Sequence, residues 1–343
     1  MDAVERYDRQ IRLWGLHGQD KCSSSKICLI NADSLGQEIL RGLCLAGIGS
    51  FIILDSQKLT AENIGSSFVP QQSIGKSRGE IVKSILLDIN EDINCENYPV
   101  EKFLPNVSDH SQTSETSTNL DVKFWKQFSC VIASGTFYTN QLDRLSKICW
   151  TNNIPLIHCI SIGFYGCFKN QLKEHIVSDT HPDWRPANAD TSKPDTATIS
   201  TRPIYEEFEN VSYDIDSEEH DDEFITAYIC LGALNLFFSL YGRMPGYNDD
   251  QVETDVSKLK GCVKKIVGKL YTELKTVDQC LYEISRYGGA ELHVTSAFTG
   301  GCVAQEVIKI VTNQYVPVDD TLIYSSAMAS VRTFQFNNIF KRQ

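Results

Sequence analysis

Hydrophobic positions near the start of the chain form two short apolar runs separated by one helical stripe. Residues 26–31 and 50–55 are rich in Ile and Leu, which is typical of central strands in a parallel sheet. Between the two runs, apolar residues recur at the spacing of one helix face: Ile39, Leu40 and Leu43. The pattern predicts a strand–helix–strand unit of the dinucleotide-binding type over residues 26–55.

The same alternation continues along the next hundred residues. Residues 79–89 and 139–151 are predicted to be helices, and residues 130–134 and 154–159 are predicted to be further parallel strands. Residues 163–175 are predicted to be longer, partly exposed β-structure. We therefore expect an α/β fold with a doubly wound, mostly parallel, Rossmann-like sheet.

Helical periodicity dominates the second half of the chain. The apolar run 225–241 has 17 residues and contains polar side chains, so we expect a buried core helix rather than a membrane span, which needs roughly 20 residues. Stripes with i, i+3/i+4 spacing predict helices over residues 252–270 and 294–311. Residues 321–326 and 330–336 are predicted to form a terminal β-hairpin.

Two polar segments interrupt the pattern. Residues 108–118 are rich in Ser and Thr and predict a flexible surface loop, whereas residues 176–223 contain four prolines and end in seven acids within ten residues. The second segment is interpreted as a solvated linker, with an acidic docking site as the alternative. It separates a Rossmann-like core, 1–175, from a C-terminal part, 224–343, that completes the same domain.

Composition limits the classes of function. The chain has 343 residues and a net charge of -12, which argues against nucleic-acid binding. The charged N-terminus does not have the pattern of a secretory signal, so the twelve cysteines are expected to be reduced thiols in the cytoplasm or nucleus. No C-x-x-C spacing occurs, and no metal site is expected.

The turn after the first strand departs from the dinucleotide-binding pattern. A G-x-G-x-x-G turn lets phosphate approach the N–H groups at the start of the following helix. Here residues 31–36 read NADSLG, so only Gly36 remains, and Asp33 places a negative charge beside the phosphate position. We therefore expect the strand–helix–strand unit to form, but we do not expect its turn to bind phosphate.

Several segments in chain order resemble the activating enzymes of ubiquitin-like proteins. They are YDRQIRLWG at 7–15, the turn above, GIGSFIILD at 47–55, SIGKSR at 73–78 and RYGGAELHVTSAFTGGCVAQEVIKI at 286–310. The resemblance is to the inactive adenylation half of a heterodimer, with a fold of the ThiF and ubiquitin-activating type. The residues within these segments favour the neddylation branch of the family. Members of that branch usually carry a long helical insertion, and the short region 176–223 that stands in its place favours the SUMO branch.

The resemblance implies ATP-dependent adenylation of a modifier's C-terminal carboxylate, with ATP and Mg²⁺ bound by the catalytic partner. Asp55 stands at the ribose-binding position and Lys76 at a phosphate-facing position. Ser66 replaces the arginine of an N-x-N-R motif, and residues 133–136 lack the metal-binding acid of an active half. Together with Gly36, these residues are interpreted as degenerate remnants, so this chain itself is expected to bind no cofactor.

Arg9 is the candidate functional residue. In the resembled family, the arginine of the N-terminal Y-D-R motif reaches across the dimer to the γ-phosphate of ATP on the partner. Such an arginine finger supplies a planar, permanent positive charge in trans. The alternative is that Tyr7, Arg9, Arg12 and Trp14 only anchor the N-terminal segment.

No cysteine is expected to form a thioester. Six lie inside apolar strands or helices, and the others lack a neighbouring acid–base group in the sequence. The missing glycines and the absent metal-binding acid argue against a self-sufficient adenylating enzyme and against a dinucleotide-dependent enzyme.

We therefore expect a regulatory subunit that is not catalytic alone and pairs with a catalytic subunit to serve a ubiquitin-like modifier, in neddylation. The alternatives are a regulatory subunit of the SUMO-activating enzyme and a shortened subunit that only binds its partner. The face with Gly300, Gly301 and Ala304 and the N-terminal segment are the interface candidates. Neither a membrane nor nucleic acid is an expected partner.

Overall fold

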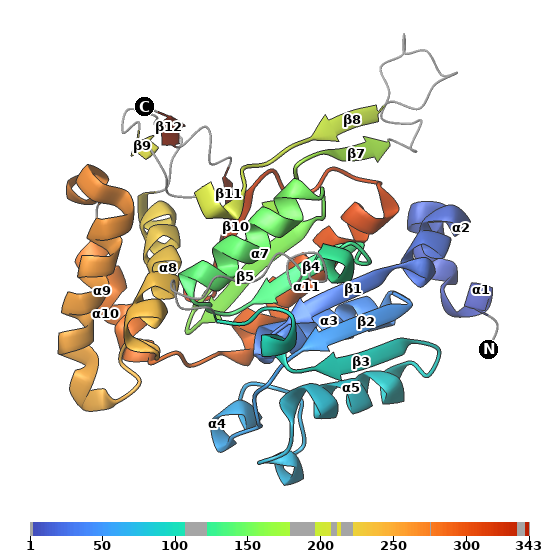
Figure 1. Ribbon diagram of the computed structural model, residues 1–343, viewed down its shortest axis with the longest axis horizontal. Coiled ribbons are helices and arrows are strands. Elements are labelled where there is room, and N and C mark those ends of the chain that lie inside the picture. Colours follow the sequence, from blue (N-terminus) through green and yellow to red (C-terminus); the bar gives the residue numbers. More distant parts are fainter. Residues whose placement is uncertain are drawn as a thin grey trace.

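The computed structural model describes residues 3–106, 122–178, 196–206, 211–213, 222–274, 276–334 and 340–342. Its centre is an eight-stranded sheet with the strand order β11-β10-β6-β5-β4-β1-β2-β3 (Figure 1). The strands are β1 (Lys26–Ile30), β2 (Ser50–Leu54), β3 (Asn94–Tyr98), β4 (Cys130–Ser134), β5 (Leu156–Ile162), β6 (Tyr165–Gln171), β10 (Thr321–Ser325) and β11 (Ser330–Phe334).

Strand directions divide this sheet into two parts. Strands β5, β4, β1, β2 and β3 run parallel, because helices connect most of them. Strands β6, β10 and β11 each pair antiparallel with the preceding strand of the sheet. The predicted Rossmann-like sheet and the terminal hairpin β10–β11 are thus confirmed.

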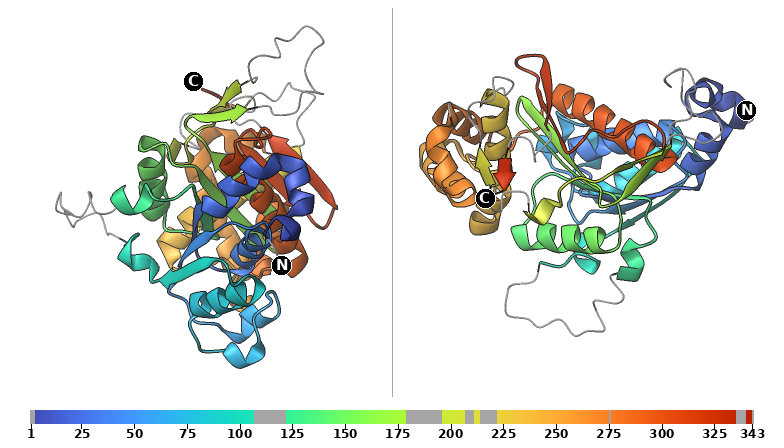
Figure 2. Two further views of the ribbon diagram at one scale, coloured as in Figure 1. Left: turned by 90° about the vertical axis from the view of Figure 1, so that its right-hand side faces the viewer. Right: turned by 90° about the horizontal axis from the view of Figure 1, so that it is seen from above.

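Side chains of the sheet alternate between two helical layers, because neighbouring residues of a strand point to opposite faces. Ile27 and Leu29 of β1 pack in the cluster with α3, α5 and α11, whereas Cys28 and Ile30 face the layer of α7. Figure 2 shows α3 and α11 on one side of the sheet and α7 on the other. These helices are α3 (Ser34–Leu45), α5 (Arg78–Ile89), α7 (Thr139–Thr151) and α11 (His293–Thr312).

Three helices cover the antiparallel strands on the side of α7: α8 (Asp222–Tyr241), α9 (Val252–Val267) and α10 (Val277–Tyr287). They enclose a separate apolar cluster with Ile160 of β5 and Ile323 of β10. Within α8, Glu223–Tyr241 has a mean hydropathy of 1.7 and is long enough to cross a membrane, but 67% of its most apolar window is buried inside the protein. This is the packing of a core helix, as the sequence predicts.

Two expectations are corrected in part. Within residues 163–175, strand β6 is buried along its whole length, since α11 covers one of its faces and the α8–α10 unit covers the other. The predicted partial exposure is found beside the strand, at Phe164, Lys173 and Glu174. Gly300 and Ala304 do not form an outer face, because they pack on α3: a Cβ on Gly300 would lie 2.8 Å from the Cβ of Glu38. Gly301 is exposed and has no neighbour within 4 Å of a Cβ position.

Short elements complete the fold. Inside the predicted linker 176–223, β8 (Thr196–Ile199) pairs with β7 (His175–Ser178), and β9 (Val211–Tyr213) pairs with β12 (Phe340–Arg342). The structure also describes residues 200–203, η4 and the start of α8 within this segment, and Thr201 and Arg202 are buried. The remainder of the segment and the predicted loop 108–118 lie outside the described residues. The remaining elements are α1 (Ala3–Arg6), α2 (Asp8–Ser24), α4 (Ala61–Ile64), η1 (Gln71–Ser73), η2 (Val100–Lys102), η4 (Ile204–Glu206), η5 (Asp249–Gln251) and η6 (Gly268–Glu273).

Candidate functional site

A cavity of about 500 Å³ lies at the carboxyl ends of β1, β2 and β4. The chain runs from β1 outward to β2 and β3 and then returns to β4 on the other side of β1, so this is the switch point of the sheet, where α/β folds bind ligands. The lining combines apolar and polar side chains: Ile30, Asn31, Leu54, Asp55, Ser56, Gln57, Arg78, Val100, Glu101, Asn106, Thr136, Phe137, Tyr138, Gln141 and Phe238.

The turn beside this cavity uses Asp33 as the N-cap of α3. The Asp33 carboxylate accepts a hydrogen bond from the backbone N–H of Gly36 at 2.8 Å and another from Ser134 Oγ at 2.6 Å. A Cβ on Gly36 would lie 2.7 Å from the carbonyl oxygen of Asn31, so this glycine permits close packing of the turn. Asp33 therefore occupies a backbone donor that a phosphate would need.

A second carboxylate reaches the same helix end from a distant part of the chain. Glu291, in the connection between α10 and α11, accepts from the backbone N–H of Ser34 at 3.1 Å and 3.2 Å to its two oxygens. Burial and the nearby charge of Asp33 raise the pKa of Glu291 to about 8, and burial raises the pKa of Asp33 as well. Two acidic side chains thus occupy the backbone donors at the start of α3, the position where the phosphates of a nucleotide approach the helix in a dinucleotide-binding fold.

Asp55 and Arg78 form a buried ion pair at the cavity wall. Arg78 Nε donates to Asp55 Oδ2 at 2.7 Å, and Asp55 also accepts from the backbone N–H groups of Ala32 and Gln57. Arg78 donates in addition to the side-chain oxygen of Asn31. Both carboxylate oxygens of Asp55 therefore have protein donors, so this acid holds the turn together.

The other predicted remnants do not join this cluster. Lys76 is exposed in the loop before α5 and does not line the cavity. At the end of β4, residues 133–136 offer no carboxylate, and Ser134 donates to Asp33 instead. The described residues also contain no group of three or more His, Cys, Asp or Glu side chains arranged to hold a metal ion.

The twelve cysteines are all free, and eleven of them are buried. Burial raises the pKa of Cys22 and Cys95 to about 12 and that of Cys44 to about 11. A reactive thiolate needs a lowered pKa and access to solvent. These three thiols have neither property.

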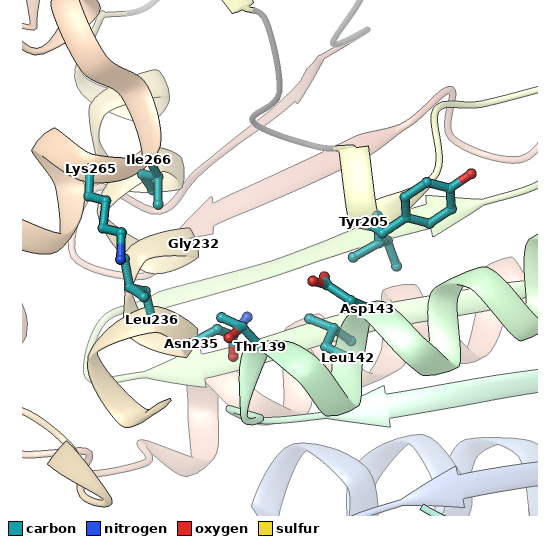
Figure 3. A pocket seen from close by; sticks show the side chains of 10 residues that line it. Thr139, Leu142, Asp143, Tyr205, Gly232, Asn235, Leu236, Lys265 and Ile266 are labelled. Carbon is teal, nitrogen blue, oxygen red and sulfur yellow. The ribbon is translucent and has the colours of Figure 1, made fainter. Parts of the chain in front are cut away.

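A second cavity of about 310 Å³ lies between α7, α8 and α9 (Figure 3). Thr139 and Asp143 of α7 face Asn235 of α8 and Lys265 of α9 across it. The Asn235 side chain already accepts a hydrogen bond from the backbone N–H of Phe137 at 2.9 Å. Besides these three helices, Ile204 and Tyr205 of η4 line this cavity.

The N-terminal segment is anchored by residues other than Arg9. Tyr7 packs against Gly47, Gln10 donates to the carbonyl oxygen of Leu45 at 3.2 Å, and the carbonyl oxygen of Trp14 accepts from Gln314 at 3.0 Å. Arg9 is exposed in the first turn of α2 and makes no hydrogen bond or ion pair with the parts of the chain that the structure describes.

Arg9 also lies at the opposite edge of the sheet from the cavity. Helix α2 leads into the first residue of β1, whereas the cavity is at the last residue of that strand. A five-residue strand spans about 16 Å, and α2 extends beyond it. An arginine side chain cannot bridge that separation, so Arg9 cannot act on a ligand in its own chain's cavity.

Sequence reasoning missed Glu291 and Arg78, although both stand in segments that carry the resemblance. Arg78 follows Lys76 by two residues, and its buried position next to Asp55 is visible only in the fold. Glu291 is 257 residues from Ser34, so no local pattern connects the two.

Comparison with known proteins identifies the family. The sequence model of the ThiF family matches residues 7–342. The NEDD8-activating enzyme E1 regulatory subunit of Gallus gallus is 23% identical to this chain, with 96% of this chain and 98% of that protein covered. The SUMO-activating enzyme subunit 1 of Dictyostelium discoideum is 25% identical over 96% of this chain and 92% of that protein.

Two further results concern fold and length. The crystal structure of Escherichia coli MccB with MccA-N7isoASN superimposes with a TM-score of 0.57 at 15% identity, covering 96% of this chain and 72% of that chain, which shows a shared fold. The alignment with the Gallus gallus protein is 536 positions long, so at least 193 positions have no residue in this chain of 343.

Proposed function

The chain belongs to the ThiF family, and from this premise we propose that it is the regulatory, non-catalytic subunit of a heterodimeric activating enzyme in protein neddylation. The relatives named NEDD8-activating enzyme E1 regulatory subunit support the pathway. In this proposal a catalytic subunit binds ATP and Mg²⁺, adenylates the modifier and carries the catalytic cysteine. The pair works in the cytoplasm, the nucleus or both.

The observation that carries the non-catalytic role is the double carboxylate at α3. Glu291 and Asp33 accept from the backbone N–H groups of Ser34 and Gly36, the donors that a phosphate would require. A triphosphate would have to displace both side chains from these backbone donors, and burying its charge without those donors is strongly unfavourable. ATP is therefore assigned to the partner.

Arg9 supplies this chain's contribution to the partner's site. Its guanidinium is exposed, has no partner among the described residues and stands far from its own cavity. A γ-phosphate held by the catalytic subunit is the anion that we assign to it, in keeping with the arginine-finger role.

Two alternative functions are each favoured by one observation. A role in SUMO activation is favoured by the relative from Dictyostelium discoideum, which matches this chain without a long gap. A subunit that binds the catalytic partner without supporting catalysis is favoured by the positions missing relative to the neddylation subunits.

The test is co-purification with the neddylation and the SUMO catalytic subunits in turn, followed by ATP–pyrophosphate exchange with each modifier. Stable pairing and exchange with the neddylation partner alone support the proposal. Pairing with the SUMO partner alone favours the first alternative, and pairing without exchange favours the second. Nucleotide binding by the isolated chain would contradict the assignment of ATP to the partner.

A further inference from the structure

The cavity of about 310 Å³ between α7, α8 and α9 is lined by three separate parts of the chain (Figure 3). Its apolar side chains are Leu142 of α7, Ile204 of η4, Leu236 of α8 and Ile266 of α9. Sites for small molecules have volumes of roughly 300–1,000 Å³ and combine an apolar lining with a few polar groups. This cavity has the volume of a small member of that class.

Asn235 of α8 presents an amide of fixed orientation to this cavity. Its Oδ1 accepts a hydrogen bond from the backbone N–H of Phe137 at 2.9 Å. Because only the oxygen can accept, Nδ2 and its two N–H donors are turned to the other side of the amide. Nδ2 donates to no group among the described residues, although Asn235 is only 8% exposed. A buried donor without an acceptor costs free energy, so this group indicates an acceptor that the chain itself does not supply.

Two sources of positive charge lie at the same cavity. Lys265 of α9 lines it, and this exposed side chain makes no hydrogen bond or ion pair within the part of the chain that the structure describes. Helix α7 begins at the cavity with Thr139, so the positive end of the helix dipole lies there. A carboxylate has the complementary charge and accepts hydrogen bonds through both of its oxygens, so it fits these donors.

A negative charge lies one helical turn further along α7. Asp143 follows Thr139 by four residues, and its carboxylate points into the cavity (Figure 3). Among the described residues that line the cavity, Asp143 and Lys265 are the charged ones. A second anionic group of a ligand would be repelled by Asp143, whereas an ammonium group would be attracted. The lining is therefore complementary to a zwitterion with an apolar body.

We propose that this cavity binds a free amino acid or a dipeptide. The carboxylate of the ligand lies at Asn235 and Lys265, its ammonium group lies toward Asp143, and its side chain lies among the apolar residues of the lining. This cavity shares no lining residue with the one at the strand ends, and the inference does not depend on the proposed function. The ligand contacts three helices and η4 at once, so its binding stabilises the folded chain.

The experiment measures the binding of L-leucine, L-phenylalanine and glycyl-L-leucine to the full chain by isothermal titration calorimetry, with the Tm as a second readout. At least one of these zwitterions is expected to bind saturably and to raise the Tm. The C-terminal amide of that compound should bind at least tenfold more weakly, because it has no carboxylate. Its N-acetyl derivative should also bind at least tenfold more weakly, because it has no ammonium group.

Two variants and one control assign the binding to this cavity. Asn235→Asp keeps the acceptor for Phe137 but replaces the two donors by a charged oxygen, and it should raise the Kd at least tenfold. Lys265→Met removes the surface charge and should have the same effect, with an unchanged circular dichroism spectrum. The matched control is Lys264→Met, because Lys264 is the neighbouring exposed lysine of α9 and does not line the cavity. The control should change the Kd less than twofold.

Four outcomes would overturn the inference. They are no saturable binding of any of the three compounds up to about 10 mM, equal affinity for the acid and its amide, an equal effect of Lys264→Met and Lys265→Met, and binding that neither cavity variant weakens. None of them affects the assays of subunit pairing and exchange, so the proposed function is tested separately.

Discussion

Nε of Arg78 lies 2.7 Å from Oδ2 of Asp55, and both side chains are almost completely buried at the carboxyl edge of the sheet. Removing one member of a buried ion pair leaves the other charge uncompensated, at a cost of about 3–5 kcal/mol. Arg78→Met should therefore lower the free energy of unfolding by about that amount, as measured by urea denaturation.

Two comparisons make this prediction specific. The double variant Asp55→Asn/Arg78→Met should be less destabilised than the sum of the single variants, since it leaves no unpaired charge. Arg12→Ala removes the exposed pair of Arg12 with Asp8 and should cost less than about 0.5 kcal/mol. Equal losses for Arg78→Met and Arg12→Ala would contradict the structural role of the buried pair.

The substitution Glu291→Gln tests the side chain that accepts from the backbone N–H of Ser34 at the start of α3. Because its pKa is raised to about 8 in the folded chain from an ordinary value of 4.5, the folded state holds a proton that the unfolded state has lost between these pH values. Stability from this group is present below pH 4.5 and falls as pH rises toward 8, by up to about 1.4 kcal/mol per pH unit.

Glutamine keeps the acceptor oxygen and does not titrate. The Tm of Glu291→Gln should therefore rise relative to the wild type between pH 5 and pH 8, and the difference should then level off. Thermal unfolding of both proteins at several pH values measures this. Parallel profiles would mean that Glu291 is ionised in the folded chain throughout.

Adjacent glycines on α11 should respond in opposite directions. A Cβ at Gly300 would press on Glu38 and the backbone of α3, so Gly300→Ala should lower the free energy of unfolding by about 1–2 kcal/mol. Gly301→Ala meets open space and gains helix propensity, so it should raise the free energy of unfolding by about 0.5–1 kcal/mol. Urea denaturation of the isolated chain measures both, and the same sign of change would contradict the close packing of α11 on α3.

Arg9→Ala should slow ATP–pyrophosphate exchange by the assembled heterodimer at least about tenfold, because a charge that neutralises phosphate is removed. Dimer affinity measured without nucleotide should stay unchanged, because the proposed role of Arg9 is to contact the partner's bound phosphate. Arg9→Lys should restore part of the rate, because lysine keeps the charge without the planar fork. Arg12→Ala is the matched control, and an unchanged rate in Arg9→Ala would reject the trans role.

Local patterns in the sequence were sufficient to predict many of the strands and helices. Continuous apolar runs predicted β1, β2, β4 and β5, because a parallel strand is buried on both faces, and the 3.6-residue stripes predicted α3, α9 and α11. The loss of glycines between residues 31 and 36 predicted a defective phosphate turn. These features depend on neighbours in the chain, so sequence alone was sufficient for them.

Contacts between distant segments were decided only by the tertiary structure. The meeting of Glu291 with Ser34, the burial of Arg78 beside Asp55 and the packing of Gly300 on α3 all join elements brought together by the sheet order and the helix layers. Residue spacing along the chain carries no record of such contacts. The sequence therefore determined that the turn after β1 lacks the glycine pattern of a phosphate-binding loop, whereas the fold decided which side chains meet at the start of α3, because only packing sets which groups share a buried site.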